Sequence, residues 1–189
     1  MHSRPMNLLH ALLLSALLLC TNAQADGAPP PLKPVPYLDV ARYMGRWYEI
    51  AKFPNRFQSK CVADTSAEYR LLEDQRIRVV NRCRLTDGKI DTATGIARPA
   101  GELSSQLKVR FAPAWLGFLP FVWGDYWVID LDPDYQLAAV SEPSREYLWI
   151  LSRTPRIGAD AYATMIRRLE AMGLDTGKLQ MSLQTEANR

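Results

Sequence analysis

The sequence predicts an all-β fold: an eight-stranded antiparallel up-and-down barrel with one C-terminal α-helix packed on its outside. Three observations support this prediction. From Gly45 onward, apolar residues recur at every second position in a series of short segments. Turn-forming runs such as Asp87-Gly88 and Asp132-Pro133-Asp134 separate these segments. After Pro155 the apolar residues change to helical spacing, which predicts one helix near the end of the chain.

Eight strands are expected from this alternation. In the second of them, for example, Ala67 and Tyr69 point to one face, while Glu68 and Arg70 point to the other. Eight strands joined by short turns favour an antiparallel sheet that closes on itself. The expected strand bounds are 45–53, 62–71, 76–84, 89–98, 103–111, 122–131, 135–141 and 146–152.

The first and last strands are apolar on both faces, so both of their faces require a cover. On the outside we expect this cover to be the helix after Pro155. Its apolar residues at helical spacing are Tyr162, Met165, Ile166, Leu169 and Met172. We also expect a short helical turn at 38–44 and a short edge strand at 178–183.

The first 25 residues have the features of a secretory signal peptide. Arg4 precedes an apolar run, Leu8–Leu19, that is too short to span a bilayer, and Ala23-Gln24-Ala25 is a small-x-small cleavage site. Removing these 25 of the 189 residues leaves 164, which suits one domain. Residues 26–36 are expected to be a proline-rich, extended spacer, and residues 37–189 the barrel domain.

Composition excludes several classes of function. Both histidines, His2 and His10, lie in the signal peptide, so the mature chain contains none. This excludes Ser-His and Cys-His catalytic pairs and histidine metal sites, and we expect no metal, no cofactor and no enzymatic activity. The mature net charge is +2, from 22 Lys and Arg against 20 Asp and Glu, without a basic block. Nucleic acid is therefore not an expected partner.

Three motifs occur in the order and at the spacing of a known family. They are Gly45-x-Trp47-Tyr48 in the first strand, Gly124-Asp125-Tyr126 in a late strand, and Tyr147–Pro155 in the last strand. Together they resemble the lipocalin family, closest to its bacterial outer-membrane members and more distantly to apolipoprotein D. The resemblance covers about residues 37–183. The middle motif is usually Thr-Asp-Tyr, so Gly124 departs from the family pattern.

The resemblance implies structural roles at the closed end of the barrel. In lipocalins the first-strand Trp lies across that end and an Arg packs over it, and these positions fall on Trp47 and Arg153, with Gly45 at the start of the strand. The cation–π contact of this pair would contribute about 1 to 2 kcal/mol where solvent is excluded. A ligand contact is the alternative role for the pair. The resemblance also implies a lipid-type ligand, with fatty acids and lysophospholipids as the candidates.

Cys61 and Cys83 are the cysteines that remain after processing, because Cys20 lies in the signal peptide. In an oxidising compartment we expect a disulfide between them. Counting by twos places both on the same face of adjacent strands, as a bond requires. The bond would contribute about 3 kcal/mol on the chain-entropy model, and a free thiol pair is the alternative.

The barrel interior is expected to hold one small ligand, because small inward residues leave space and apolar residues form the walls. A fully packed core without a cavity is the alternative. Glu49 shares the face of Trp47, so it should point inward and be hydrogen-bonded. The expected cavity wall consists of Ala51, Phe53, Ala67, Tyr69, Val79, Leu107, Val109 and Phe111.

These features favour a non-enzymatic carrier of a fatty acid, lysophospholipid or similar lipid, in envelope lipid transport, storage or membrane maintenance. An envelope protein-interaction module is one alternative. Another is an enzyme that acts on a hydrophobic substrate, for which Glu49, Glu68 and Asp125 are the available bases. The sequence leaves the identity of the ligand and the oligomeric state open.

The loop 112–121, between the fifth and sixth strands, is unusually apolar for a connection. In an up-and-down barrel alternate loops lie at the same end, which places this loop at the open mouth. Exposed apolar clusters mark lipid, membrane or protein contacts, whereas a lid folded over the cavity is the alternative. In either case we expect the gate for ligand entry to consist of Trp115, Leu116, Phe118 and Phe121.

The targeting signals predict export across the inner membrane. We expect a soluble periplasmic product cut after Ala25, with association to the outer membrane left open. Lipidation of Cys20 is the alternative. Lipidated bacterial cysteines follow a small residue, whereas Leu19 is large, so a lipid anchor is disfavoured.

Overall fold

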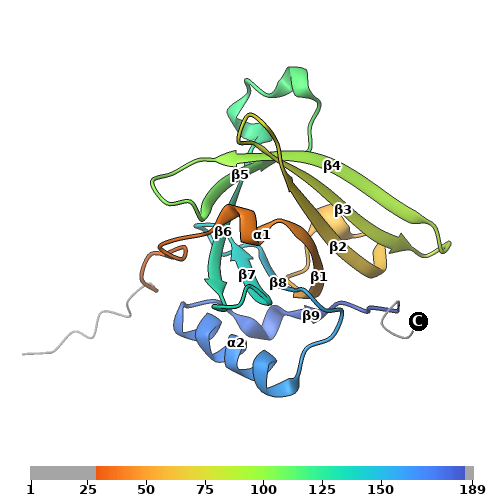
Figure 1. Cartoon of the computed structure of the whole chain (residues 1–189). Helices are drawn as coiled ribbons and strands as arrows, with labels where there is room; N and C mark the ends of the chain where they lie inside the picture. Colours follow the sequence, from red (N-terminus) through yellow and green to blue (C-terminus); the bar gives the residue numbers. More distant parts are fainter. Residues whose placement is uncertain (1–28, 186–189) are drawn as a thin grey trace, which may run out of the picture.

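The computed structural model describes residues 29–185, which form a closed antiparallel barrel with a helix against one side (Figure 1). The predicted signal peptide with Cys20, residues 26–28 of the predicted spacer and residues 186–189 lie outside the described residues. The strands are β1 (Gly45–Lys52), β2 (Cys61–Leu71), β3 (Ile77–Leu85), β4 (Ile90–Pro99), β5 (Gln106–Arg110), β6 (Gly124–Leu131), β7 (Leu137–Ser141), β8 (Leu148–Ser152) and β9 (Gln180–Met181). The helices are α1 (Val40–Tyr43) and α2 (Ala159–Ala171), with short 3-10 helices η1 (Arg56–Gln58), η2 (Ala114–Leu116), η3 (Pro120–Val122) and η4 (Thr176–Lys178).

The strands β1 to β8 follow one another around the barrel, each antiparallel to the next. β1 closes the ring, because Tyr48 pairs with Ser152 of β8 and Trp47 pairs with Ala67 of β2. The short strand β9 pairs with the end of β1 and lies within the edge strand expected at 178–183. The predicted eight-stranded barrel with one C-terminal helix is therefore confirmed. None of the helices within residues 29–185 combines the length and the apolar character of a membrane-spanning helix.

The observed strand bounds lie within three residues of the expected ones. The largest difference is at β5, which begins at Gln106 rather than at residue 103. Here the N–H of Gln106 donates to the carbonyl of Leu103 at 3.0 Å, so the chain turns before it enters the sheet. The buried hydroxyl of Ser105 also donates to the carbonyl of Val35, which connects this turn to the N-terminal segment.

Two apolar clusters stabilise the barrel, one inside and one outside. The inner cluster includes Tyr43, Trp47 and Leu107. The outer cluster lies between the barrel wall and α2, where Met165 and Leu169 are fully buried. Burial of each such side chain contributes about 1.5 to 3 kcal/mol. The helix thus covers the outer faces of β1, β6, β7 and β8, and Figure 1 shows it beneath these strands.

Residues 29–36 are extended, as their prolines predict, but they lie against the barrel. Leu32 is buried in the outer cluster, and the N–H of Val35 donates to the carbonyl of Val128 at 2.8 Å. The side chain of Arg145 donates to the carbonyl of Pro30. This part of the predicted spacer therefore belongs to the folded unit.

A β-bulge in β1 changes which of its residues face the interior. The register steps from Glu49 to Ala51 against consecutive residues of β8, so Ile50 is the extra residue. Before the bulge Trp47 belongs to the inner cluster, whereas after it Ala51 and Phe53 belong to the outer cluster beneath α2. The prediction that Ala51 and Phe53 line the cavity is wrong, because strict alternation does not hold across the bulge.

Candidate functional site

The barrel contains a cavity of about 750 Å³ that opens at one end. Its lining comes from the inner faces of the strands and from the β1–β2, β5–β6 and β7–β8 connections. A volume of this size is typical of small-molecule sites. The apolar part of the lining includes Ala67, Tyr69, Val79, Ala93, Val109, Phe111, Val140 and Leu151.

The structure places most, but not all, of the predicted wall residues at this cavity. The residues that line it are Ala67, Tyr69, Val79, Val109 and Phe111. Leu107 belongs to the inner cluster, but it is only 2% exposed within the packed base and does not reach the cavity. Ala51 and Phe53 lie outside the barrel, as described above. The interior is therefore hollow above a packed base rather than packed throughout.

The closed end of the barrel is sealed by Trp47 and Arg153. Trp47 is fully buried, and the guanidinium carbon of Arg153 lies 4.0 Å from the centroid of its ring. The same guanidinium donates to the carbonyls of Arg42 at 2.7 Å, Arg46 at 2.9 Å and Tyr135 at 3.2 Å. It thus connects α1, β1 and the β6–β7 turn. Neither Trp47 nor Arg153 is among the residues that line the cavity.

Gly45 is required at the start of β1 by its backbone conformation. Its φ is +93°, in a region where residues with a Cβ are strained. A Cβ at this position would also lie 3.3 Å from Nη1 of Arg153. The glycine therefore lets the guanidinium approach the strand and cover the indole.

Next to the packed base, three tyrosine hydroxyls form a hydrogen-bonded chain. The hydroxyl of Tyr126 lies 2.9 Å from that of Tyr43 and 2.8 Å from that of Tyr69. Tyr69 and Tyr126 line the cavity, whereas Tyr43 is fully buried. Burial raises the pKa of all three phenols, that of Tyr69 to about 12, so they stay protonated at neutral pH. Three hydroxyl protons serve these two contacts, so one proton is not used between the three tyrosines.

An aromatic row forms a second feature of the wall that sequence reasoning missed. The rings of Phe57 and Tyr147 lie 5.5 Å apart, and those of Tyr147 and Trp149 stack at 5.8 Å. All three line the cavity. The indole N–H of Trp149 donates to Oε1 of Gln58 at 2.9 Å, which fixes the ring. Because β8 is apolar on both faces, alternation gave no signal for which of its aromatic residues face inward.

Glu49 lies in the cavity lining, as its shared face with Trp47 predicts, and its carboxylate is fully engaged. It accepts hydrogen bonds from Nζ of Lys52 at 3.0 Å, Nε2 of Gln58 at 2.5 Å and Oγ of Ser182 at 2.5 Å. The carboxylate thus holds η1 and the segment after β9 against β1. Its geometry is that of a structural group, because both carboxylate oxygens accept hydrogen bonds from within the protein.

The other two candidate bases are also bound by cations. Glu68 accepts from Arg82 at 2.8 Å, and this hydrogen bond lowers the pKa of Glu68 below its usual value. Asp125 pairs with Lys108 at 3.0 Å. Glu68 is not among the cavity-lining residues, whereas Asp125 is. The structure does not gather the three predicted bases in the cavity.

The match to a family model agrees with this geometry. The model of the lipocalin-like domain matches residues 38–184, from α1 through the barrel and α2. The chain belongs to the lipocalin family. Members of this family bind small hydrophobic ligands.

Several proteins have sequences similar to this lipocalin. Temperature-induced lipocalin-1 of Arabidopsis thaliana is 45% identical over 152 residues, which cover 79% of this chain and 81% of that protein. Outer membrane lipoprotein Blc of Escherichia coli K12 is 36% identical over 166 residues, with coverage of 87% and 89%. Apolipoprotein D of Macaca fascicularis is 29% identical over 154 residues, covering 77% of each chain. The predicted likeness to bacterial outer-membrane lipocalins and to apolipoprotein D is confirmed.

Solved structures resemble the lipocalin fold described above. Insecticyanin from the tobacco hornworm Manduca sexta aligns with a TM-score of 0.65 and 21% identity, covering 85% of this chain and 88% of that chain. Apocrustacyanin C2 aligns with a TM-score of 0.62 and 14% identity, covering 79% and 81%. At these identities the likeness supports the fold alone.

The disulfide predicted for this lipocalin is confirmed. Cys61, at the start of β2, is bonded to Cys83 near the end of β3, with a Cα–Cα distance of 5.6 Å. Both cysteines line the cavity. The bond therefore holds two neighbouring strands together beside the ligand space.

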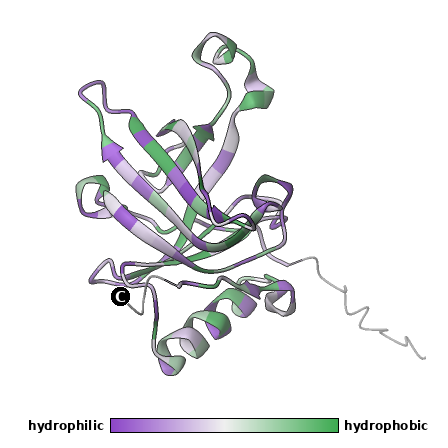
Figure 2. Cartoon of the chain, turned by 90° about the vertical axis from the view of Figure 1, so that its right-hand side faces the viewer, coloured by the Kyte–Doolittle hydropathy of each residue, from purple (hydrophilic) through white to green (hydrophobic). Residues whose placement is uncertain are grey.

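The four predicted gate residues lie on segment 111–123, hereafter the tip loop, which projects from the lipocalin barrel at the top of Figure 1. Trp115, Phe118 and Phe121 are 73%, 79% and 79% exposed, and Leu116 is partly buried. Figure 2 shows hydrophobic colouring along this loop. Phe121 lines the cavity, whereas the other three do not. The two ends of the tip loop therefore line the cavity, whereas Trp115 and Phe118 in its middle are exposed outside that lining.

Replacing Arg153 by Ala is expected to lower the free energy of unfolding by about 2 to 4 kcal/mol. The variant loses the contact with Trp47 and leaves three carbonyls without their donor. Urea unfolding of the mature protein measures this loss, and Arg167→Ala, an exposed arginine of α2, is the control. Because the pair lies below the cavity, lipid affinity should change less than stability. A variant that unfolds like the wild type but has lost its ligand would contradict the structural role.

Tyr69 is expected to make the free energy of unfolding decrease as the pH rises from about 10 to about 12. The folded protein holds the phenol proton with a pKa of about 12, against an ordinary value of 10.0. The resulting stabilisation is complete below pH 10 and is lost as the pH passes 12, a change of about 2 to 3 kcal/mol. Urea unfolding across this range should show a shallower pH dependence for Tyr69→Phe than for Tyr37→Phe, an exposed control. Equal slopes in the two variants would rule out this contribution.

Proposed function

We propose that this lipocalin binds and carries a fatty acid, a lysophospholipid or a similar lipid, and that it serves envelope lipid transport, storage or membrane maintenance. The observation that carries the proposal is the open cavity of about 750 Å³ with its apolar and aromatic walls. An elongated hydrophobic molecule can lie along these walls and remove apolar surface from water. The polar groups at the wall, Glu49 above all, are already bonded within the protein.

A carrier is favoured over an enzyme by the state of the candidate catalytic groups. The mature chain would contain no histidine, since both lie in the predicted signal peptide. Glu49, Glu68 and Asp125 are each paired with a cation. Because each of these three carboxylates is held by a cation, none of them is free to act as a general base on a ligand in the cavity.

The envelope is the proposed location. One relative is named as an outer membrane lipoprotein of Escherichia coli, and another as apolipoprotein D. The predicted signal peptide supports export across the inner membrane to the periplasm, with the outer membrane as the site of association. Lipidation of Cys20 is the alternative form of attachment, and an intact mass that begins at an acylated Cys20 would identify it.

Lipid extracted from the purified mature protein is expected to contain one acyl ligand per chain. Mass spectrometry of the extract identifies the ligand and its stoichiometry. Ala93 lines the cavity and its side chain is exposed there, so Ala93→Trp should fill the space and reduce the amount of bound lipid several-fold. Ala161→Trp, on the exposed face of α2, is the matched control. Absence of lipid in the extract, together with no uptake of added fatty acid or lysophospholipid, would favour an interaction module instead.

The tip loop is proposed as the gate through which the lipid passes and as the site of membrane contact. Replacing both Trp115 and Phe118 by Ser should slow lipid uptake from vesicles at least several-fold, because these exposed rings would enter the bilayer interface. Stopped-flow transfer of a fluorescent fatty acid measures the rate, and thermal unfolding checks the fold. Tyr37→Ser with Leu183→Ser removes two other exposed apolar side chains as the control. If the folded tip-loop variant takes up lipid from vesicles at the wild-type rate, the tip loop is not the gate for lipid entry.

A further inference from the structure

The charges of the described residues are divided unevenly along the chain. Residues 29–110 contain 15 Lys and Arg against 9 Asp and Glu, whereas residues 111–185 contain 6 against 9. The first range holds β1 to β5, and the second holds β6 to β9 and α2. One side of the barrel is therefore basic, although the formal net charge of the whole chain is only +3.

The basic side has its densest part on the outer face of β1, β2 and β3. Arg70 lies directly opposite Arg78 in the β2–β3 register, and Arg46 lies opposite Glu68 in the β1–β2 register. Arg82 completes the group by pairing with Glu68 at 2.8 Å. The face thus presents four guanidinium groups around a single carboxylate. We call this surface, formed by Arg46, Glu68, Arg70, Arg78 and Arg82, the arginine face.

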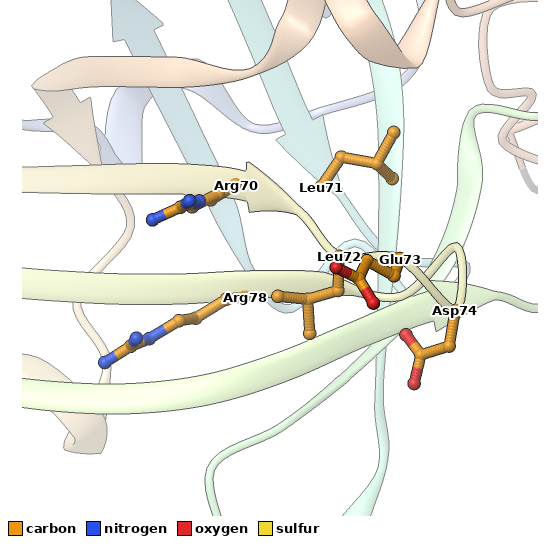
Figure 3. Close-up of a pocket in the computed structure, with 6 residues that line it drawn as sticks. All are labelled: Arg70, Leu71, Leu72, Glu73, Asp74 and Arg78. Atoms are coloured by element: carbon orange, nitrogen blue, oxygen red, sulfur yellow. The ribbon is translucent and has the colours of Figure 1, made fainter.

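Arg70 and Arg78 are two arginines of this face that lack a direct partner among the described residues, although the charge of Arg78 helps to lower the pKa of Glu68. Neither forms a side-chain hydrogen bond or an ion pair with any of residues 29–185. Figure 3 shows both side chains extending in the same direction, away from Glu73 and Asp74 in the β2–β3 turn. Asp74 is itself bound by Arg76 at 2.6 Å. Like charges directly opposite across two strands are destabilising, so an external anion between them would relieve a cost that the fold bears.

The basic surface continues from the arginine face toward the tip loop. On the neighbouring strands Arg98 lies opposite Lys108, on the outward face of β4 and β5. The ring of Trp123 lies 4.3 Å from the guanidinium carbon of Arg98 and 5.2 Å from that of Arg110. Trp123 is the last residue of the tip loop, and its indole N–H donates to the carbonyl of Gly117 at 2.8 Å. Cationic side chains therefore adjoin the exposed apolar loop directly.

We propose that the arginine face binds the phosphate groups of anionic phospholipids in a membrane surface, while the tip loop enters the interface of the same bilayer. This inference rests on the proposed membrane contact of the tip loop and adds the class of lipid that the protein selects. Guanidinium groups match phosphate geometry through paired N–H donors. A basic surface beside exposed aromatic residues is the pattern of interfacial binding, whereas an acidic protein partner would leave the apolar loop unexplained.

Vesicle cosedimentation of the mature protein tests the proposal. Binding to phosphatidylcholine vesicles, which carry no net charge, measures the contribution of the tip loop alone. Binding to vesicles with equal amounts of phosphatidylcholine and phosphatidylglycerol measures the added contribution of the anionic headgroups. Binding is expected to be at least tenfold tighter to the anionic vesicles and to weaken as NaCl increases, because salt screens exposed charges. Arg70→Gln with Arg78→Gln should reduce binding to anionic vesicles by between about fivefold and 25-fold, at about fivefold for each charge removed.

Controls separate this proposal from the proposed function. Arg167→Gln with Lys178→Gln removes two cations from the α2 side and should leave anionic binding within about twofold. The Arg70 and Arg78 double variant should keep its extracted lipid and its binding to neutral vesicles, and should unfold at the same or a higher temperature. If no lipid is found in the cavity but the wild type still prefers anionic vesicles, the proposed carrier function is wrong and the proposed membrane binding by the arginine face is supported. The proposal that the arginine face binds a membrane would be overturned if the double variant bound anionic vesicles as tightly as the wild type. It would also be overturned if the wild type bound anionic and neutral vesicles equally, and an acidic protein would then be the partner to test.

Discussion

The contact between Arg153 and Trp47 is the interaction on which the closed end of the barrel depends. It joins the first strand of the ring to the segment that follows the last, so it acts where the sheet must close. The guanidinium can do this because it has donors left for three carbonyls after it covers the indole. Glycine at position 45 removes the Cβ that would crowd it. Once this end is sealed by side chains, the space above it becomes a cavity with its opening at the other end.

A single extra residue in β1 lets one strand serve two apolar clusters. Before Ile50 the strand contributes Trp47 to the interior, and after it the strand contributes Ala51 and Phe53 to the contact with α2. A regular strand would have turned Phe53 into the cavity and reduced its volume. The bulge therefore keeps the interior hollow and supplies part of the surface that the helix covers.

Polar groups are treated differently inside and outside the barrel. Inside, Glu49 and the hydroxyls of Tyr43, Tyr69 and Tyr126 are bonded to one another or to neighbours. Burial of these groups would be costly without those bonds, and with them the cavity offers a largely apolar surface with few donors. Outside, Arg70 and Arg78 form no hydrogen bond or ion pair with residues 29–185, and aromatic rings of the tip loop are exposed. The proposed ligand site and the proposed arginine face thus lie on opposite faces of the same strands, β2 and β3.

The sequence by itself determined the barrel, its helix, the disulfide pair and part of the cavity wall. Period-two patterning specifies a sheet face wherever one side is buried, which is why Val79 and Val109 were placed correctly. Only the tertiary structure decided the position of the bulge, the row of Phe57, Tyr147 and Trp149, and the meeting of the three tyrosines. A bulge leaves no mark in a strand that is apolar on both faces, and the tyrosines come from α1, β2 and β6. Contacts between such distant segments depend on register and closure, which arise only when the whole sheet forms.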